Sequence, residues 1–431
     1  MSLLTSLWSG RSGLQASSTD LSVIGDNISN ANTIGFKGSR AAFEDALAQN
    51  LMGVNAAAMS QRGLGTKLQA IQRIMVQGAL VNTGLATDLA IQGPGFFVVK
   101  GNYGGQEGQF YTRAGQFTVD ENGMLVNLDG LRVQGYLADA VGNITRQVGD
   151  LQVGNAISAP RATTTISIDA NLDADATIPP AWDPTDPTGT SNFSTSVTVY
   201  DSLGNAHQVE VYFRKNGAGD WEWHAMTDGA NVQGGTAGTL SEIASGTLTF
   251  GTNGELTAQT QTSNFNPVGA TQPQPLTFDF GTDTGSGGTG LDGITQFAGA
   301  SAASFINQDG YPAGDLSFVT VESDGTVVGT FSNGEVRALG QVVLADFQAP
   351  DQLTRLGGNL FGETKQSGEP TIDSAGTGGR GALVSGALEQ SNVDLAEEFI
   401  RMITAQRGFQ ANSKVISTSD QLLAELMTLK R

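Results

Sequence analysis

Apolar residues recur at every seventh position at both ends of the chain. Near the N-terminus they are Leu7, Leu14, Leu21 and Ile28, and near the C-terminus they are Leu395, Met402, Phe409, Ile416 and Leu423. This spacing keeps one stripe of a helix turned towards a partner. We therefore predict helices over residues 2 to about 30 and 392 to about 429, and we expect them to pair. The simpler alternative is a C-terminal helix that packs only on its own domain.

A second stripe of the predicted C-terminal helix is apolar only at its ends. Phe399 and Met427 are apolar, whereas the positions between them are occupied by Gln406, Ser413 and Asp420. Those three polar positions need water or polar partners. We expect Ser391 or Asn392 to cap the helix, because a side-chain oxygen there accepts from the free backbone amides of the first turn.

The middle of the chain has the pattern of antiparallel hairpins. Nine Asn-Gly or Asp-Gly pairs lie between positions 122 and 334, and several follow alternating apolar residues. Such pairs favour hairpin turns in which both central residues have positive φ. This region is therefore predicted to be antiparallel β. Before it, Ala41–Leu51 is expected to form a short helical turn and Met59–Gly65 a loop.

Composition divides the chain into nested segments. Val, Leu and Phe dominate two stretches, whereas the stretch between them is rich in Thr, Ser, Gly and Asn and predicts a domain with a small core. The predicted fold class is α+β and multidomain, with paired, coiled-coil-like terminal α-helices and two nested antiparallel β domains inserted between them. The expected parts are a terminal helical domain (1–32 and 390–431), a connector region (33–74 and 362–389, with 362–385 a glycine-rich linker), an inner β domain (75–158 and 305–361) and an outer β domain (159–304).

Charge and composition exclude several classes of function. The net charge of −20 opposes binding to nucleic acid or to an anionic membrane surface. No run of apolar residues is long enough to cross a membrane, so no membrane insertion is expected. The N-terminus lacks the pattern of a signal peptide, which fits a cytoplasmic protein and equally one exported with its N-terminus intact.

Candidate chemistry is sparse. The chain has no cysteine and only two histidines, His207 and His224, and neither belongs to a metal-binding spacing. Both are expected to be structural. No nucleophile, phosphate-binding loop or paired-carboxylate constellation is present. We therefore predict no catalytic residues, no metal and no cofactor, and we expect the protein not to be an enzyme.

Short motifs cluster at the two ends of the chain. A further group lies between Gln77 and Phe97. The terminal groups include Asn27, Asn30, Asn32, Thr33, Gly35, Phe36 and Lys37, and then Asn392, Asp394, Gln406, Arg407 and Asn412. Together these motifs resemble those of the bacterial flagellar axial proteins, which comprise rod, hook and hook-associated subunits. The size of the chain and the segment 159–304 resemble hook subunits more than distal rod subunits, which are shorter.

The resemblance implies a subunit of a helical homopolymer. The terminal helices would line an inner tube and meet neighbouring subunits through their seven-residue stripes, and the β domains would form outer layers. Gln406, Ser413 and Asp420 would face the channel, although an ordinary solvated helix face explains them equally well. The implied product is the hook, a hollow, curved and flexible tube. It acts as a universal joint that transmits torque from rod to filament and conducts exported subunits.

The resemblance also implies partners and a location. The partners are further copies of the chain, the distal rod protein, the hook cap, the hook–filament junction proteins and the flagellar type III export apparatus. The location is the extracellular part of the flagellum, next to the basal body, after export without a cleaved signal peptide. Two alternatives stay open. One is a distal rod or other axial subunit with the same ends, and the other is a secreted β-rich adhesin.

Overall fold

The computed structural model describes residues 3–46, 49–51 and 60–428. The chain divides into two compact units. The first comprises Met1–Ala156, Phe318–Thr330 and Val336–Arg431, and the second comprises Ile157–Ser317 and Phe331–Glu335. Along the sequence, the second unit therefore lies between segments of the first.

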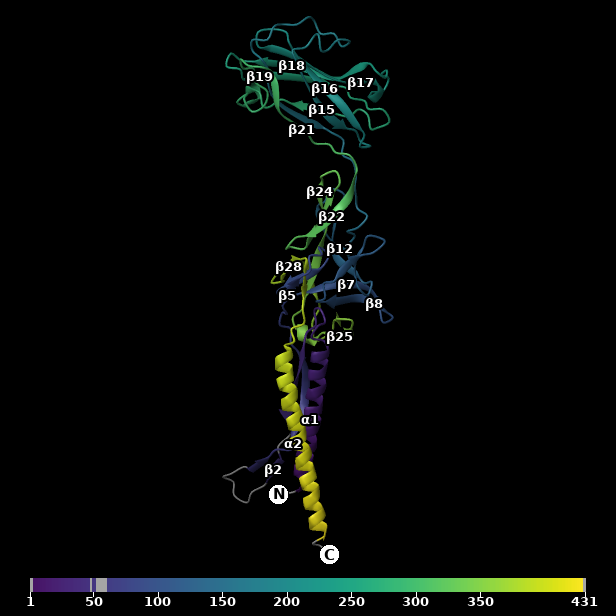
Figure 1. Cartoon of the computed structure of the whole chain (residues 1–431), viewed down its shortest axis with the longest axis vertical. Helices are drawn as coiled ribbons and strands as arrows, with labels where there is room; N and C mark the ends of the chain where they lie inside the picture. Colours follow the sequence, from purple (N-terminus) through teal and green to yellow (C-terminus); the bar gives the residue numbers. More distant parts are fainter. Residues whose placement is uncertain (1–2, 47–48, 52–59, 429–431) are drawn as a thin grey trace. The chain divides into compact units, whose positions relative to one another are not determined.

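Two long helices of the first unit lie side by side, α1 (Leu3–Ser29) and α2 (Leu395–Thr428) (Figure 1). They are antiparallel, because the end of α1 meets the start of α2 where Asn27 donates to Glu398. The predicted pairing of the terminal helices is confirmed. Asp394 caps α2, since its carboxylate accepts from the backbone amides of Ala396 and Glu397. The prediction that Ser391 or Asn392 is the cap was wrong.

The segment after α1 forms strands where a helical turn and a loop were expected. β1 (Ser39–Asp45) pairs antiparallel with β4 (Thr66–Arg73), and β2 (Gln49–Leu51) pairs with β3 (Ser60–Arg62). Met59 lies outside the described residues. The helix-forming alanines of β1 are overridden because Ser39–Asp45 pairs along its whole length with Thr66–Arg73 of β4, and this backbone pairing requires the extended conformation.

The main body of the first unit is a large, mostly antiparallel sheet around two apolar clusters. Phe97, Val99 and Leu344 are fully buried in one cluster, and Phe96 and Phe361 lie in the other. The strands are β7 (Phe96–Tyr103), β8 (Gln106–Thr112), β9 (Phe117–Val119), β10 (Leu125–Asn127), β11 (Arg132–Ala138), β12 (Ile144–Asp150), β22 (Gly314–Val321), β23 (Thr326–Phe331), β24 (Val336–Asp346), β25 (Thr354–Gly357), β26 (Leu360–Gly362) and β27 (Thr371–Ser374), with the 3-10 turn η3 (Pro350–Gln352) before β25.

The return segment towards α2 takes part in sheets and is not simply a linker. Within it, β27 pairs with β24, and β28 (Ala382–Ser385) pairs with β6 (Leu89–Gln92). Next to these, β29 (Ala387–Glu389) pairs with β5 (Leu80–Asn82). Its many glycines suggested a flexible chain, but they occupy the turns between short paired strands. The return segment thereby brings the start of α2 to the strands that follow α1 in the sequence.

The second unit contains a five-stranded antiparallel sheet and a three-stranded sheet. Trp221 and Trp223 are fully buried in its apolar cluster, so the expectation of a small core was wrong. The order in the three-stranded sheet is β20-β14-β21, and β14 and β20 are parallel. The elements are β13 (Ile157–Ser158), β14 (Thr165–Asn171), β15 (Phe193–Tyr200), β16 (Ala206–Lys215), β17 (Asp220–Asp228), η1 (Gly229–Asn231), β18 (Leu240–Phe250), β19 (Leu256–Ser263), β20 (Thr277–Asp279), η2 (Thr284–Ser286) and β21 (Ala302–Gln308).

The hairpin turns differ in type from the expectation. In the turn after β9, Gly123 has a φ of 78°, but Asn122 is not among the described residues with positive φ. The backbone amide of Gly123 donates to the carbonyl of Asp120, as in a type I turn followed by a left-handed glycine. The Asp120 carboxylate accepts from the amides of Asn122 and Met124 and holds this shape. A side chain that accepts from its own turn therefore selects the turn type.

Candidate functional site

The contact between α1 and α2 is built from small residues. A Cβ on Gly13 would lie 2.5 Å from Nδ2 of Asn412, and one on Gly10 would lie 2.9 Å from Cγ1 of Ile416. Both glycines therefore let α2 approach the backbone of α1 closely. This agrees with the sequence pattern, in which small residues separate the N-terminal leucines.

The predicted stripe of α2 is only partly covered by α1. Met402, Ile416 and Leu423 are half-buried, as are Leu7, Leu14, Leu21 and Ile28 on α1. In contrast, the exposed fractions of Leu395, Phe399, Phe409 and Met427 are 43%, 50%, 40% and 77%. The most buried residues of α2 in the described part are Glu398, Ala405 and Ser419. Close backbones leave room for small side chains at the centre of the contact, so the larger ones lie at its flanks.

The polar positions Gln406, Ser413 and Asp420 are exposed on α2. A helix turns about 100° per residue, which places these three on one flank of the helix, next to Leu395 and Phe399. Their predicted place at the channel of a tube stays a prediction. The exposure of these three side chains in the subunit is consistent with a position at the channel and equally with an ordinary helix face in contact with solvent.

A buried ionic cluster joins the start of the C-terminal segment to the strands that follow α1. Glu389 is fully buried, and its carboxylate lies 2.6 Å from Nζ of Lys37 and 3.3 Å from Nη1 of Arg113. It also accepts from the backbone amide of Gly78. Burial lowers the pKa of Lys37 and of Arg113, and the Glu389 carboxylate opposes both shifts. The cluster is therefore held by mutual pairing away from water.

Two asparagines of the motifs connect backbone segments beside this cluster. Asn27 donates to the carbonyl of Ser39 and accepts from its amide, while Asn392 donates to the carbonyls of Ile74 and Val76. Asn392 also accepts from the amide of Gly38. An amide side chain both donates and accepts, so each asparagine satisfies a strand edge that would otherwise be unpaired.

The other motif residues have separate roles. Asn30 donates to Asp26 and accepts from Thr33, which closes the end of α1. Gly35 has a φ of 69° and lies against the backbone of Arg113, and Phe36 is buried. Asn32, Gln406 and Arg407 are exposed. The motifs thus form one structural junction and leave part of α2 open to solvent.

The sequence did not predict that Glu389 and Arg113 belong to this junction. The Lys37–Glu389 hydrogen bond joins residues 352 positions apart, and the Arg113–Glu389 bond joins residues 276 apart. Glu389 follows two apolar residues in a short strand, and that placement of a lone carboxylate was the available signal. A buried charge needs a partner, but its identity depends on the fold.

The two histidines lie apart from each other, and neither belongs to a metal site in the described ranges. There, no group of three His, Cys, Asp or Glu side chains is placed to hold a metal ion. His207 lies 3.1 Å from Asp201, and His224 lies 2.8 Å from Glu242, each within the second unit. No helix among the described residues is long and apolar enough to span a membrane.

Family models match four stretches of the chain. They are the flagella basal body rod protein (residues 7–37), the flagellar hook protein FlgE/F/G D1 domain (90–171), the flagellar basal body protein FlaE D2 domain (171–311) and the flagellar basal body rod FlgEFG protein C-terminal region (384–429). The first and last of these cover most of α1 and α2.

Relatives match over nearly the whole length. The flagellar hook protein FlgE of Escherichia coli strain K12 is 37% identical over 427 residues, covering 97% of this chain and 98% of that protein. The FlgE of Borreliella burgdorferi is 37% identical over 456 residues, covering 99% and 100%. The crystal structure of Helicobacter pylori flagellar hook protein FlgE2 aligns with a TM-score of 0.49 at 16% identity, covering 72% of this chain and 100% of that one.

The paired terminal helices, the β units and these matches define a structural protein of the bacterial flagellum. Within that class, identities of 37% over nearly the full length show that the chain belongs to the flagellar hook protein family. The recognition made from the terminal motifs is confirmed, and the chain is a structural subunit of the hook. The matches do not favour the distal rod or adhesin alternatives.

Proposed function

We propose that this subunit polymerises into the hook through its terminal helix pair. The observation that carries the proposal is the large apolar surface of α2 that α1 leaves open. Phe399, Ile403 and Phe409 are 50%, 51% and 40% exposed. Exposed apolar side chains on one helix favour burial against a partner. In a homopolymer that partner is a neighbouring copy.

The finer features of the polymer follow from the same surface. The apolar stripes of α1 and α2 would meet neighbouring subunits in an inner tube, and Gln406, Ser413 and Asp420 would line the channel. A polar wall suits the passage of unfolded cargo, since between Phe399 and Met427 this flank of α2 offers the cargo polar side chains instead of apolar ones. The β units would form nested outer layers, and sliding between them would let the tube bend while it transmits torque.

The proposal includes partners and a route. The distal rod protein, the hook cap and the hook–filament junction proteins would contact the ends of the polymer, and the flagellar type III apparatus would export the chain without cleaving a signal peptide. The subunit would work outside the cell and would have no catalytic activity. Immunogold labelling of isolated flagella tests the location: gold on the curved segment supports it, and gold confined to the straight rod contradicts it.

The substitution Phe409→Asp tests the role of the helix stripe. Because Phe409 is already partly exposed in the subunit, the aspartate should leave the subunit folded. It should abolish polymer formation, because a carboxylate is costly to bury in an apolar contact between subunits. Electron microscopy of hooks and circular dichroism of the monomer measure the two effects. Ser413→Asp is the matched control on the polar flank and should still assemble. Normal hooks with Phe409→Asp would contradict the proposal.

A further inference from the structure

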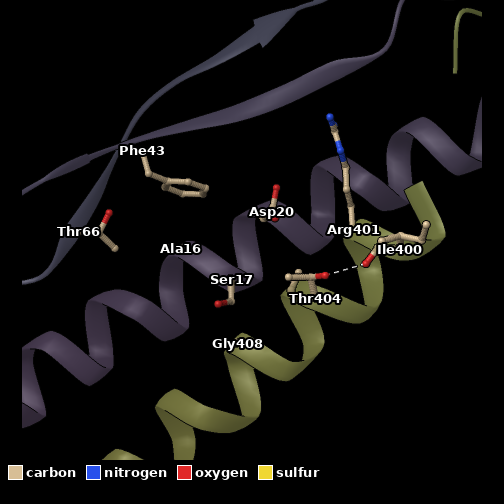
Figure 2. A pocket seen from close by; sticks show the side chains of 10 residues that line it. Ala16, Ser17, Asp20, Phe43, Thr66, Ile400, Arg401, Thr404 and Gly408 are labelled. Atoms are coloured by element: carbon tan, nitrogen blue, oxygen red, sulfur yellow. Dashed lines mark hydrogen bonds between the residues drawn. The ribbon is translucent and has the colours of Figure 1, made fainter. Parts of the chain in front are cut away.

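An open groove lies between α1, α2 and the β1–β4 ribbon. Figure 2 shows its walls: Ala16 and Asp20 from α1, Ile400, Arg401 and Thr404 from α2, and Phe43 from β1. The groove has a volume of about 390 Å³. Ile400 is 66% exposed and Phe43 is 36% exposed, so apolar surface borders the groove on two sides. The groove is therefore an incomplete packing site on the subunit.

Asp20 and Arg401 are the charged residues that line this groove, and two further carboxylates of α2 compete with Asp20 for Arg401. Arg401 lies 2.8 Å from Glu397 and 3.5 Å from Glu398. Within the described part of the chain, Asp20 makes no side-chain hydrogen bond or ion pair, and Oε2 of Glu398 is buried without a hydrogen-bond partner. Burial raises the pKa of Asp20, and Arg401 opposes that shift. A second cation beside Asp20 would relieve this imbalance.

Arg407 has the properties of that cation. It is exposed on α2, and its guanidinium has no partner among the described residues. Two residues earlier, Ala405 is buried against α1, so Arg407 points to the opposite side of the helix, about 200° away. In its own subunit Arg407 makes no ion pair with Asp20, and Arg401 is the cation that acts on that carboxyl there. A second copy of the chain can bring Arg407 to the groove.

The residues next to Arg407 also fit an apolar groove. Ile403 lies one turn before Arg407 on the same face of α2 and is 51% exposed. Lys414 is another exposed cation of α2, but the residues one turn before and one turn after it are polar, Gln410 and Thr418. It therefore brings no apolar side chain to an apolar groove. Arginine also has a planar group that binds a carboxylate through two parallel hydrogen bonds. Charge and shape together favour Arg407 over Lys414.

We propose that the groove of one subunit receives the Ile403–Arg407 face of α2 from a second copy. The Arg407 guanidinium then pairs with the Asp20 carboxylate, and Ile403 covers Phe43 and Ile400. This contact rests on the proposed polymerisation and specifies one of its interfaces. It uses the side of α2 that faces away from α1, so it leaves the pairing of the helices within each subunit intact.

A double-mutant cycle tests the pair. Asp20→Asn and Arg407→Gln each remove one charge with little change of shape. Each should raise the concentration at which the purified full-length chain polymerises, by about tenfold. The double variant should be no worse than either single variant, because both remove the same interaction. Asp20→Asn with Lys414→Gln is the matched control, and its effects should add. Additive effects for Asp20 and Arg407, or no effect of either, would overturn the pairing.

Cross-linking in assembled hooks tests the same contact without removing either charge. The chain has no cysteine, so the introduced thiols are the only ones that can form a disulfide in these variants. Ala16→Cys with Gln410→Cys should give a ladder of linked copies on oxidation, whereas Ala16→Cys with Ser413→Cys should not. Hooks that form without a ladder for the first pair would overturn this interface and leave polymerisation intact. Failure of the unmodified chain to polymerise would instead contradict the proposed function.

Discussion

Glu389 is the residue on which the junction of the first unit depends. It has no exposed surface, and its carboxylate receives a lysine, an arginine and a backbone amide. The lysine, Lys37, also donates to the carbonyl of Val76. Each of these buried groups is a hydrogen-bond or ionic partner of another. Removing one of them therefore leaves a buried polar group without its partner.

Lys37→Met should destabilise the first unit by about 3–5 kcal/mol, because it leaves part of the charge of a buried pair uncompensated. Hydrogen exchange at β5 and β29 measures the loss. Hydrogen exchange at β16 and β17, which belong to the second unit, should be unchanged. Lys67→Met is the matched control: its pair with Glu44 is exposed, and no measurable change is expected. Equal amide protection of β5 and β29 in Lys37→Met and Lys67→Met would mean that the Lys37–Glu389 pair does not stabilise the first unit.

Glu398 predicts a pH dependence of the helix pair. Burial raises the pKa of its carboxyl above the usual value for glutamate, although Asn27 and Arg401 oppose the shift. A carboxyl whose pKa is raised by folding binds its proton more readily in the folded state. Its contribution to stability is therefore fully present below the unfolded pKa and is lost as the pH rises through the folded pKa.

Glu398→Gln should consequently flatten the pH dependence of amide protection in α1 and α2 at and above pH 4.5. The glutamine keeps an oxygen that accepts from Asn27, so the geometry should be preserved. Glu397→Gln removes a neighbouring charge that also raises the pKa of Glu398, so it should weaken the dependence without abolishing it. A pH profile that is the same in the unmodified chain and in Glu398→Gln would refute the assignment.

At the scale of elements, the fit of α1 against α2 depends on where glycine occurs. Gly13 lies against the side chain of Asn412, whereas a Cβ on Gly25 meets no atom within 4 Å. Both residues are in the interior of α1, so their intrinsic effect on the helix is the same. A difference in stability between the same substitution at Gly13 and at Gly25 therefore measures the contact of α1 with α2.

Gly25→Leu should stabilise α1 by about 0.5–1 kcal/mol, because leucine favours a helix more than glycine does. Gly13→Leu should instead destabilise the helix pair by about 1–3 kcal/mol, because its side chain needs space that α2 occupies. Amide exchange over α1 measures both effects, and hook assembly should fail only for Gly13→Leu. Gains of the same size in both variants would show that the helices do not approach closely at Gly13.

At the scale of the molecule, most of the second unit is a single segment, 159–313, that begins and ends at one pair of strands. Ser158 of β13 lies opposite Gly314 of β22, so the two chain ends of the segment 159–313 are adjacent. Strands in such a pair are separated by about 5 Å, a distance that a linker of a few residues spans. The segment can therefore be removed without stretching what remains.

Replacing residues 159–313 by a short Gly-Ser linker should leave the first unit folded, because its apolar clusters contain no residue of that segment. The shortened chain should still assemble through its helices, and the resulting tubes should lose their normal curvature. Electron microscopy of the tubes and hydrogen exchange of β7 and β24 measure the two outcomes. Hooks of normal curvature would mean that the second unit is a tolerated surface module.

The sequence by itself determined the features that depend on near neighbours. The seven-residue stripes predicted both terminal helices, and the terminal motifs identified the family. Asn-Gly and Asp-Gly pairs indicated the β-rich middle of the chain. Each of these signals lies within a few turns or one hairpin, where local backbone preference and apolar periodicity decide the structure.

Only the tertiary structure decided which groups from distant segments meet. Local propensity favoured a helical turn at Ala41–Leu51, yet pairing with β4 made β1 a strand. The stripe through Phe409 predicted one packed face, yet the glycines of α1 brought α2 close enough for small residues to fill the contact. Glu389 found Lys37 and Arg113 only because the chain returns to its start. Such contacts depend on the path of the whole chain, and no local pattern encodes that path.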